Sequence, residues 1–277
     1  MLYDTHLHLI YPDKLRYPWL ESFEVLNKPS IFDSYLTRAR RVGITACLHM
    51  EVDVAENQIK EETALVADLM ARPQSPMRGA ISACRPEDPN FPEFLDWART
   101  VPTIKGFRRV LHVMPDELSQ TDTFRNNISR LTGTGLTFDL CVLPHQLVWA
   151  GQLIDHCPDV TFILNHCGVP DVKGGEIEPW GGRLSELAKR PNVLAKISGL
   201  IAYGDPDSWS LDDLRPFFEH TVSAFGHNRL VWGSDSPVCN LGGGLETWVS
   251  ATHALTDTWQ AADKAAFLHD NAAELWG

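Results

Sequence analysis

The chain has 277 residues, of which 44% are hydrophobic, so it is long enough for one large barrel or sandwich or for two modest domains. Its 36 acidic residues outnumber 24 basic ones and give a formal net charge of −12. This charge argues against nucleic acid and anionic membrane surfaces as partners, because both bind clustered Lys and Arg. It says little about small molecules.

The cysteines are scattered and form no Cys-x-x-Cys pair. Four of them lie within or beside apolar, strand-like runs, which predicts buried free thiols in a reducing cytoplasm. No charged-then-apolar leader precedes the first strand, and no apolar run approaches the length of a bilayer span. We therefore expect a soluble, cytoplasmic protein. The six positions are Cys47, Cys84, Cys141, Cys157, Cys167 and Cys239.

Hydrophobic periodicity and Gly/Pro breaks predict strands that alternate with helices along the whole chain. In chain order, the expected elements are a strand over 3–9, a helix over 33–41, a strand over 44–50, a helix over 54–71, a strand over 78–84, a helix over 91–100, a strand over 103–113, a helix over 121–131, a strand over 136–143, a helix over 146–156, a strand over 160–166, a helix over 182–189, a strand over 193–198, a helix over 211–225, a strand over 229–234 and helices over 245–255 and 259–275. Pro216 predicts a kink or a late start in the helix over 211–225.

Eight strand candidates that alternate with helices are the signature of a (β/α)8 TIM barrel, an α/β fold, here as a single domain over residues 1–277. The main rival is a doubly wound open sheet, which would ordinarily carry a Gly-rich turn after its first strand. The chain instead has Tyr11-Pro12-Asp13-Lys14 after that strand. We find no internal repeat and no linker.

The first strand carries two histidines, His6 and His8. Because side chains alternate in a strand, both point to the same side, with Asp4 in line behind them. Two neutral imidazoles at this spacing can share one metal ion or polarise one substrate oxygen. A structural role is commoner for such a pair taken alone. Apolar neighbours nevertheless indicate a buried strand, where the pair costs free energy unless it is hydrogen-bonded or ligated.

The active site of a barrel lies at the C-terminal ends of its strands, so polar residues there are the candidates. They are His6 and His8 on the first strand, Arg108 and His112 on the fourth, Asp139 on the fifth, His166 closing the sixth, Ser198 on the seventh and Asp235 closing the eighth.

Asp235 follows an apolar strand within Gly233-Ser234-Asp235-Ser236-Pro237. Local sequence alone favours a turn or cap role for such an aspartate. In a closed barrel, however, the first and eighth strands are neighbours, which places Asp235 beside the His6 and His8 pair. That position makes it a candidate general base.

Arg108 and Arg109 point to opposite sides of the fourth strand, so only one can face the interior. If Gly106, Arg108, Val110 and His112 form the inward set, Arg108 is a fixed cation suited to a substrate carbonyl or carboxylate. Lys105 would then face the helices. Among the aromatic residues, Trp19, Trp180 and Trp209 lie in loop-like stretches, where one of them could cover a substrate ring, although core packing is the commoner role.

These residues and several motifs resemble the amidohydrolase superfamily, specifically its amidohydrolase-2, lactonase-like branch. The main ones are His6-x-His8, His166, and Asp235 within Gly-Ser-Asp-x-Pro. Further similar stretches are Arg16-Tyr17-Pro18-Trp19, Ile104-Lys105-Gly106-Phe107-Arg108-Arg109-Val110-Leu111, Phe138-Asp139-Leu140, Pro144-His145-Gln146-Leu147, Asn165-His166-Cys167-Gly168-Val169-Pro170 and Lys196-Ile197-Ser198-Gly199-Leu200.

The resemblance implies a hydrolase that opens a small-molecule lactone, often a sugar-acid lactone of carbohydrate metabolism or a related carboxylated lactone. Asp235 would activate water, and the histidines would polarise the carbonyl or hold a metal. Arg108 would bind the substrate. The catalytic candidates are His6, His8, His166 and Asp235, and the further substrate-binding candidates are Asp139, His112, Trp19 and Ser198.

The same resemblance implies at most one divalent metal ion, zinc or manganese, held by His6, His8 and Asp235, since the branch includes members that work without metal. Asp139 occupies the fifth strand, where two-metal members usually carry a histidine. Ser236 stands where the branch usually has tryptophan, and Leu143 where arginine is common, so both should reshape the pocket.

Two other functions stay open at this stage. The superfamily includes metal-dependent, non-oxidative decarboxylases of aromatic or unsaturated acids. A catalytically silent barrel would serve as a binding or scaffold protein, and it would be favoured if the candidate side chains did not converge. Assembly into a homo-oligomer is also left open.

Overall fold

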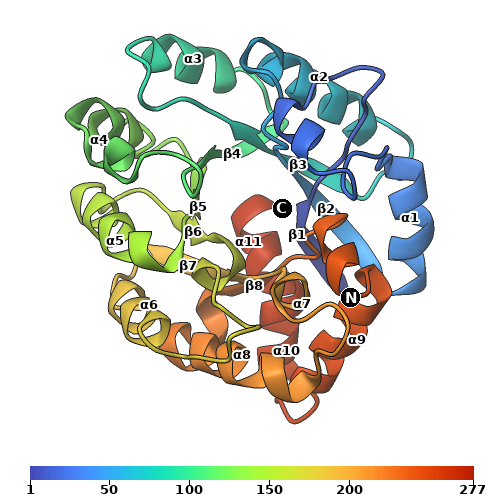
Figure 1. Cartoon of the computed structure of the whole chain (residues 1–277). Coiled ribbons are helices and arrows are strands. Elements are labelled where there is room, and N and C mark those ends of the chain that lie inside the picture. The colour runs from blue at the N-terminus through green and yellow to red at the C-terminus, as the bar shows by residue number, and fades with distance from the viewer.

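The computed structural model describes residues 1–277 and contains one sheet of eight parallel strands, rolled into a barrel (Figure 1). Each strand pairs with the next in chain order, from the first to the eighth. All eight predicted strands are present, so the predicted (β/α)8 barrel is confirmed. The strands are β1 (Leu2–Leu7), β2 (Ile44–Met50), β3 (Met77–Ala83), β4 (Ile104–Val110), β5 (Thr137–Cys141), β6 (Phe162–Leu164), β7 (Val193–Ile197) and β8 (Leu230–Trp232).

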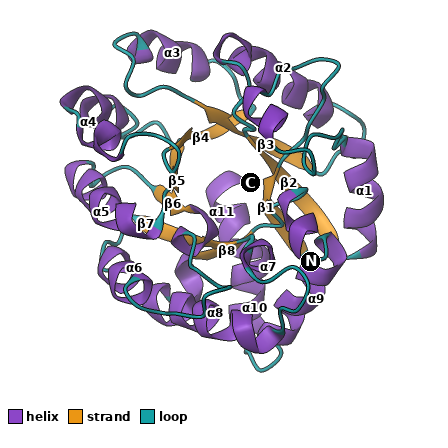
Figure 2. Cartoon of the chain, viewed as in Figure 1, coloured by secondary structure: helices purple, strands orange, loops and turns teal.

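Most helices form an outer ring around the strands (Figure 2). Each β-strand leads into a helix that returns the chain to the other end of the barrel, as parallel strands require. The helices are α1 (Phe32–Arg41), α2 (Ile59–Met70), α3 (Phe91–Ala98), α4 (Asp122–Ser129), α5 (Leu147–His156), α6 (Trp180–Ala188), α7 (Leu200–Tyr203), α8 (Leu211–Phe225), α9 (Leu245–Leu255), α10 (Ala261–Ala265) and α11 (Asn271–Trp276).

Three helix predictions need correction. The helix predicted from residue 54 begins at Ile59, because a 3-10 turn precedes it. The helix over 211–225 has the predicted bounds, but the late start that Pro216 suggested does not occur, since Ser210 and Asp213 form a capping box that holds its first turn. The last predicted helix is divided into α10, a π-helical turn and α11. The short helix α7 was not predicted.

The barrel closes through the segment that follows β8. The backbone N–H of Asp235 donates to the carbonyl of His6 at 2.9 Å, and that of His8 donates to the carbonyl of Ser236 at 2.8 Å. A parallel bridge joins Leu7 to Ser236. Closure therefore fixes Asp235 beside both histidines through backbone hydrogen bonds.

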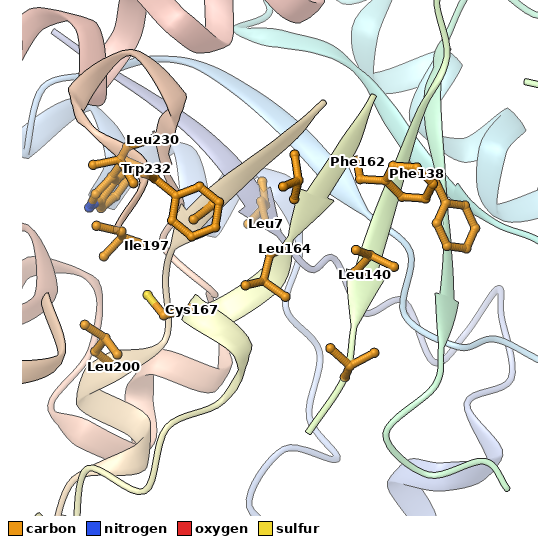
Figure 3. Packing of buried hydrophobic residues seen from close by; sticks show 14 of the residues in the cluster. Leu7, Phe138, Leu140, Phe162, Leu164, Cys167, Ile197, Leu200, Leu230 and Trp232 are labelled. Atoms are coloured by element: carbon orange, nitrogen blue, oxygen red, sulfur yellow. The ribbon is translucent and has the colours of Figure 1, made fainter. Parts of the chain in front are cut away.

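Alternate residues of the strands pack outward against the helices (Figure 3). Phe138 and Leu140 of β5 point to this layer, as do Phe162 and Leu164 of β6, and all four are buried. The rings of Phe138 and Phe162 meet edge to face with centroids 6.1 Å apart. The period-2 pattern thus fills the space between barrel and helices.

A second apolar cluster fills the barrel interior at the N-terminal end of the strands. It includes Tyr3, Leu48 and Ile81 from the strands together with Trp276 of α11. The indole N–H of Trp276 donates to the hydroxyl of Thr137, the first residue of β5. Figure 1 shows α11 in the middle of the ring of strands. Because α11 covers this end, the opposite end is the one that can admit a ligand.

A β-bulge in β1 overturns the expected orientation of Asp4. The pairing with β2 shifts by one residue between Asp4 and Leu7. As a result, Asp4 turns toward α1, where its carboxylate accepts from the hydroxyl of Tyr35 at 2.7 Å. His6 remains inside the barrel. The prediction that Asp4 lies in line behind the histidines is therefore wrong.

Two composition-based predictions have counterparts in the structure. All six cysteines are buried and none forms a disulfide, as predicted. No helix combines the length and the hydropathy that crossing a bilayer would require.

Candidate active site

Four predicted side chains converge at the C-terminal end of the barrel. The Nε2 atoms of His6 and His8 lie 3.2 Å apart. One carboxylate oxygen of Asp235 lies 3.7 Å from Nε2 of His6 and 3.5 Å from Nε2 of His8. The other lies 3.8 Å from Nδ1 of His166. The first, sixth and eighth strands thus bring three imidazoles and one carboxylate into a single cluster.

Burial keeps the three imidazoles neutral. It lowers the pKa of His8 to about 3 and that of His166 to about 4. The pKa of His6 is also lowered well below its ordinary value, again mainly by burial. Near neutral pH these rings therefore offer lone pairs and N–H groups rather than positive charge.

The tautomer of His8 follows from its hydrogen bond. Its Nδ1 lies 3.0 Å from the backbone carbonyl of Met50. Because a carbonyl oxygen only accepts, Nδ1 carries the proton and Nε2 presents a lone pair to the cluster. On the opposite side, the hydroxyl of Ser198 lies 2.9 Å from Nδ1 of His166. Ser198 is fully buried and positions His166, so the prediction that it contacts substrate is not supported.

Local backbone geometry aims Asp235 and His166 at the cluster. Both have left-handed conformations, with φ of 55° and 52°, which non-glycine residues rarely adopt. Strain of this kind persists where the surroundings impose it, often at functional sites. Gly199, with φ of 71°, lies against both: a Cβ there would be 2.7 Å from a carboxylate oxygen of Asp235. Burial also raises the pKa of Asp235 above its ordinary value.

Arg108 faces the cluster, as the inward set on the fourth strand predicts. Its Nη1 lies 3.5 Å from Nε2 of His6. Arg109 points to the other side and pairs with Glu87 at 2.7 Å. The sequence reasoning missed the partner of Arg108, which is Glu51: Nε donates to its carboxylate at 2.5 Å and Nη2 to its backbone carbonyl at 2.8 Å. The feature of the sequence that could have pointed to Glu51 is its position directly after the second strand.

Asp139 lies below the site rather than in it. Its carboxylate accepts from Lys196 at 2.8 Å and from Asn165 at 2.7 Å, and it is fully buried. Lys196 also donates to the backbone carbonyl of Thr5 at 3.0 Å. Asp139 therefore neutralises a buried lysine that joins three strands, and the predicted role in substrate binding is not supported.

A cavity of about 440 Å³ opens above the cluster. This volume is in the range of small-molecule sites. His112 and Trp19 line it, as predicted, whereas Trp180 and Trp209 do not. Its polar and charged lining residues are His8, Asp53, Arg108, His112, His166 and Asp235. Another hollow, of about 470 Å³, lies between α2 and α3, but none of the converging side chains lines it.

Three donor atoms in the cluster match a divalent metal ion. Atoms of His6, His8 and Asp235 lie within 4.8 Å of one another. Two imidazole nitrogens and a carboxylate oxygen are common ligands of such ions. The carbonyl of Met50 fixes His8 in the orientation that metal-ligating histidines usually have. The residues therefore fit one divalent ion.

Comparisons with known proteins agree with this geometry. An uncharacterised protein of Sinorhizobium fredii is 26% identical over 99% of this chain and 97% of its own. An L-fucono-1,5-lactonase of Burkholderia multivorans is 25% identical over 99% of this chain and 95% of its own.

Among solved structures, a zinc-bound amidohydrolase from Burkholderia multivorans superposes with a TM-score of 0.89 at 21% identity, covering 100% of this chain and 99% of its own. At this identity the match shows the shared barrel fold. The family model described as amidohydrolase matches residues 3–277. The chain therefore belongs to the amidohydrolase family.

Proposed function

We propose that this protein hydrolyses lactones, with Asp235 as the base that activates water. The observation that carries the proposal is the convergence of Asp235 with neutral imidazoles and with Arg108 at the floor of one cavity. The L-fucono-1,5-lactonase among the relatives supports the same reaction class. A catalytically silent barrel would be favoured if these side chains lay apart, and they do not.

Asp235 suits the task of a general base. Burial raises its pKa toward the pH at which a general base transfers protons most efficiently. A water molecule beside Asp235 gives up its proton to the carboxylate, and the resulting hydroxide forms a bond to the carbonyl carbon of the lactone. The carbonyl oxygen then carries negative charge.

Arg108 is placed to stabilise this oxyanion. Its Nε and Nη2 donate to Glu51, so Nη1 is the edge that faces the cluster near His6. Donors preset at such an oxygen typically contribute about 10²–10³-fold in kcat. When the bond from the acyl carbon to the ring oxygen breaks, Asp235 returns its proton to that oxygen. The product is the open-chain hydroxy acid.

A divalent ion held by His6, His8 and Asp235 would polarise the carbonyl and lower the pKa of bound water. Contacts within the protein fix the positions of His6, His8, His166, Asp235 and Arg108. Met50 and Ser198 orient His8 and His166, and Glu51 orients Arg108. Sugar-acid lactones, expected from the sequence, and other small lactones form the first substrate panel.

The test compares the wild type with Asp235→Asn in a pH-indicator assay, because ring opening releases a proton. General-base catalysis supplies roughly 10²–10⁴-fold, so kcat/KM on a lactone that the wild type opens should fall by at least that factor. Asp53→Asn is the matched control, since Asp53 is another carboxylate of the same cavity and pairs with Arg85.

Wild-type rates in Asp235→Asn, with its circular dichroism spectrum unchanged, would refute the role of this carboxylate. Carbon dioxide release from an aromatic or unsaturated acid, with no lactone opened, would instead support a decarboxylase. Metal content measured on the same samples shows whether an ion accompanies either activity.

A further inference from the structure

The wall of the cavity is apolar above its catalytic floor. Of the 20 lining residues, 13 are hydrophobic and one more is a proline, which leaves six polar ones. Four of these six belong to the floor: His8, Arg108, His166 and Asp235. The lining includes no Ser, Thr, Asn, Gln or Lys. A polyhydroxylated ring would therefore lose hydrogen bonds to water with few replacements in the wall.

Three polar groups outside the floor already have a partner, whereas the hydroxyl of Tyr203, which also lines the cavity, makes no hydrogen bond within the protein. Asp53 lies 3.4 Å from the guanidinium of Arg85. The indole N–H of Trp19 donates to a backbone carbonyl at 2.8 Å, so Trp19 presents its ring to the cavity. His112 has Nδ1 3.1 Å from the sulfur of Cys141. These contacts leave few donors or acceptors for the substituents of a substrate.

The cavity also holds no unpaired cation for an anionic substituent. Arg108 is the one Lys or Arg in the lining, and Glu51 neutralises it at 2.5 Å with both side chains buried. A carboxylate or sulfonate on the substrate would therefore meet an arginine whose charge Glu51 already balances, with only Nη1 free of that pair, and would lie near Asp53 and Asp235. Desolvating an anion without a free partner is costly.

The apolar wall continues to an exposed apolar rim. Phe23, Val113 and Leu241 are 55%, 67% and 38% exposed and line the same cavity. They are three of the eight large hydrophobic residues exposed in the whole chain. They come from the segments that follow β1, β4 and β8, and so surround the opening. Grouped apolar exposure around a cavity mouth is typical of a ligand-binding surface.

We propose that the preferred substrate is a lactone with an uncharged apolar substituent, such as an alkyl chain, which lies along this wall and covers the rim. This inference rests on the proposed ring-opening reaction: water adds to the carbonyl carbon, the acyl–oxygen bond breaks, and the ring oxygen takes the proton. The lactone ring lies on the polar floor, and the substituent extends outward past Leu143 and Val113.

The first experiment measures kcat/KM on unsubstituted δ-valerolactone, on δ-lactones with alkyl chains of increasing length, and on an aldono-1,5-lactone. Burying a methylene contributes enough free energy for roughly a fourfold rise in kcat/KM per added group. The expected result is such a rise until the chain passes the rim, with the aldonolactone no faster than the unsubstituted ring. Values that are flat or fall with chain length, or a faster aldonolactone, would overturn the proposal.

The second experiment uses Val113→Asn, with Val148→Asn as its matched control. Both valines are exposed, but Val148 lies on α5 outside the cavity. Val113→Asn should lower the dependence of kcat/KM on chain length several-fold, and Val148→Asn should leave that dependence unchanged. Equal chain-length dependence in all three proteins would contradict the assignment of the wall.

A binding measurement separates this inference from the proposed reaction. Alkyl-substituted δ-lactams keep the ring shape but resist hydrolysis. The change in their affinity with chain length, measured by calorimetry, therefore reports contacts with the wall without any turnover. Lactam affinity that rises with chain length supports the apolar wall even if no lactone is opened, in which case the proposed reaction fails. Affinity that does not change with chain length refutes the apolar preference, whatever the turnover.

Discussion

Glu51→Gln should strongly destabilise the protein, because it leaves the guanidinium of Arg108 buried without its countercharge. Both side chains are buried and lie 2.5 Å apart. Removing one partner of such a pair costs about 3–5 kcal/mol. For a chain of this size, that corresponds to a fall of roughly 6–20 °C in Tm. Glutamine retains an acceptor for the backbone N–H of Asp53, which donates to Glu51 at 2.7 Å.

The double variant Glu51→Gln with Arg108→Met separates stability from activity. Removing both charges should recover most of the lost stability, because the uncompensated buried charge is gone. It should not recover turnover, since no donor then faces the carbonyl oxygen. Glu56→Gln is the control: Glu56 lies 3.7 Å from Arg85 and is 70% exposed, so its change should cost less than about 1 kcal/mol.

The assay is urea or thermal unfolding followed by circular dichroism, with lactone hydrolysis measured on the same samples. A free energy of unfolding for Glu51→Gln within about 1 kcal/mol of the wild-type value would refute the reasoning. A double variant no more stable than Glu51→Gln would do so as well. Turnover at the wild-type rate in the double variant would show that Arg108 does not stabilise the oxyanion.

Three further predictions test the site and its scaffold. Gly199→Ala places a methyl group 2.7 Å from the Asp235 carboxylate at φ of 71°, so kcat should fall at least tenfold and stability by about 1–3 kcal/mol; unchanged kcat would contradict this packing. If the metal site fits as inferred, zinc at 100 times its Kd should stabilise the wild type by about 2.7 kcal/mol, measured as a Tm shift that His8→Asn abolishes. Arg38 donates hydrogen bonds to Glu246 and lowers the pKa of this carboxyl from 4.5 to about 2. The pair therefore stabilises the fold at pH values above the pKa that Glu246 has in the unfolded chain. This stabilisation is lost as the pH falls from about 4.5 to about 2. Glu246→Gln should thus cost less than about 1 kcal/mol at pH 7 and a smaller amount at pH 2, as unfolding curves at both pH values would show.

Local sequence patterns predicted the barrel because they reflect local physics. Alternating apolar runs and helical periodicity recur eight times, and all eight strands appear where these patterns place them. Barrel topology then predicted a contact between the two ends of the chain. Since the first and last strands must meet, His6, His8 and Asp235 had to be neighbours. Some helix ends were less accurate, because short 3-10 turns decide them, as they do before α2.

The orientation of single side chains depended on register, which the sequence does not display. One bulge turns Asp4 toward α1 although strand alternation predicts the interior. Asp139 occupies a strand position that suits a ligand, yet it pairs with Lys196, 57 residues away in the chain. Pairings of this kind are set by how far neighbouring strands are staggered.

The sequence by itself determined the fold, the position of the histidine pair at the end of the first strand and the arrival of Asp235 beside it. Only the tertiary structure decided that Glu51 holds Arg108 and that Ser198 positions His166. It alone also decided that an apolar wall stands above this polar floor. The physical reason is that a cavity is lined by residues from many loops, each following a different strand, so its chemistry emerges only when the barrel closes.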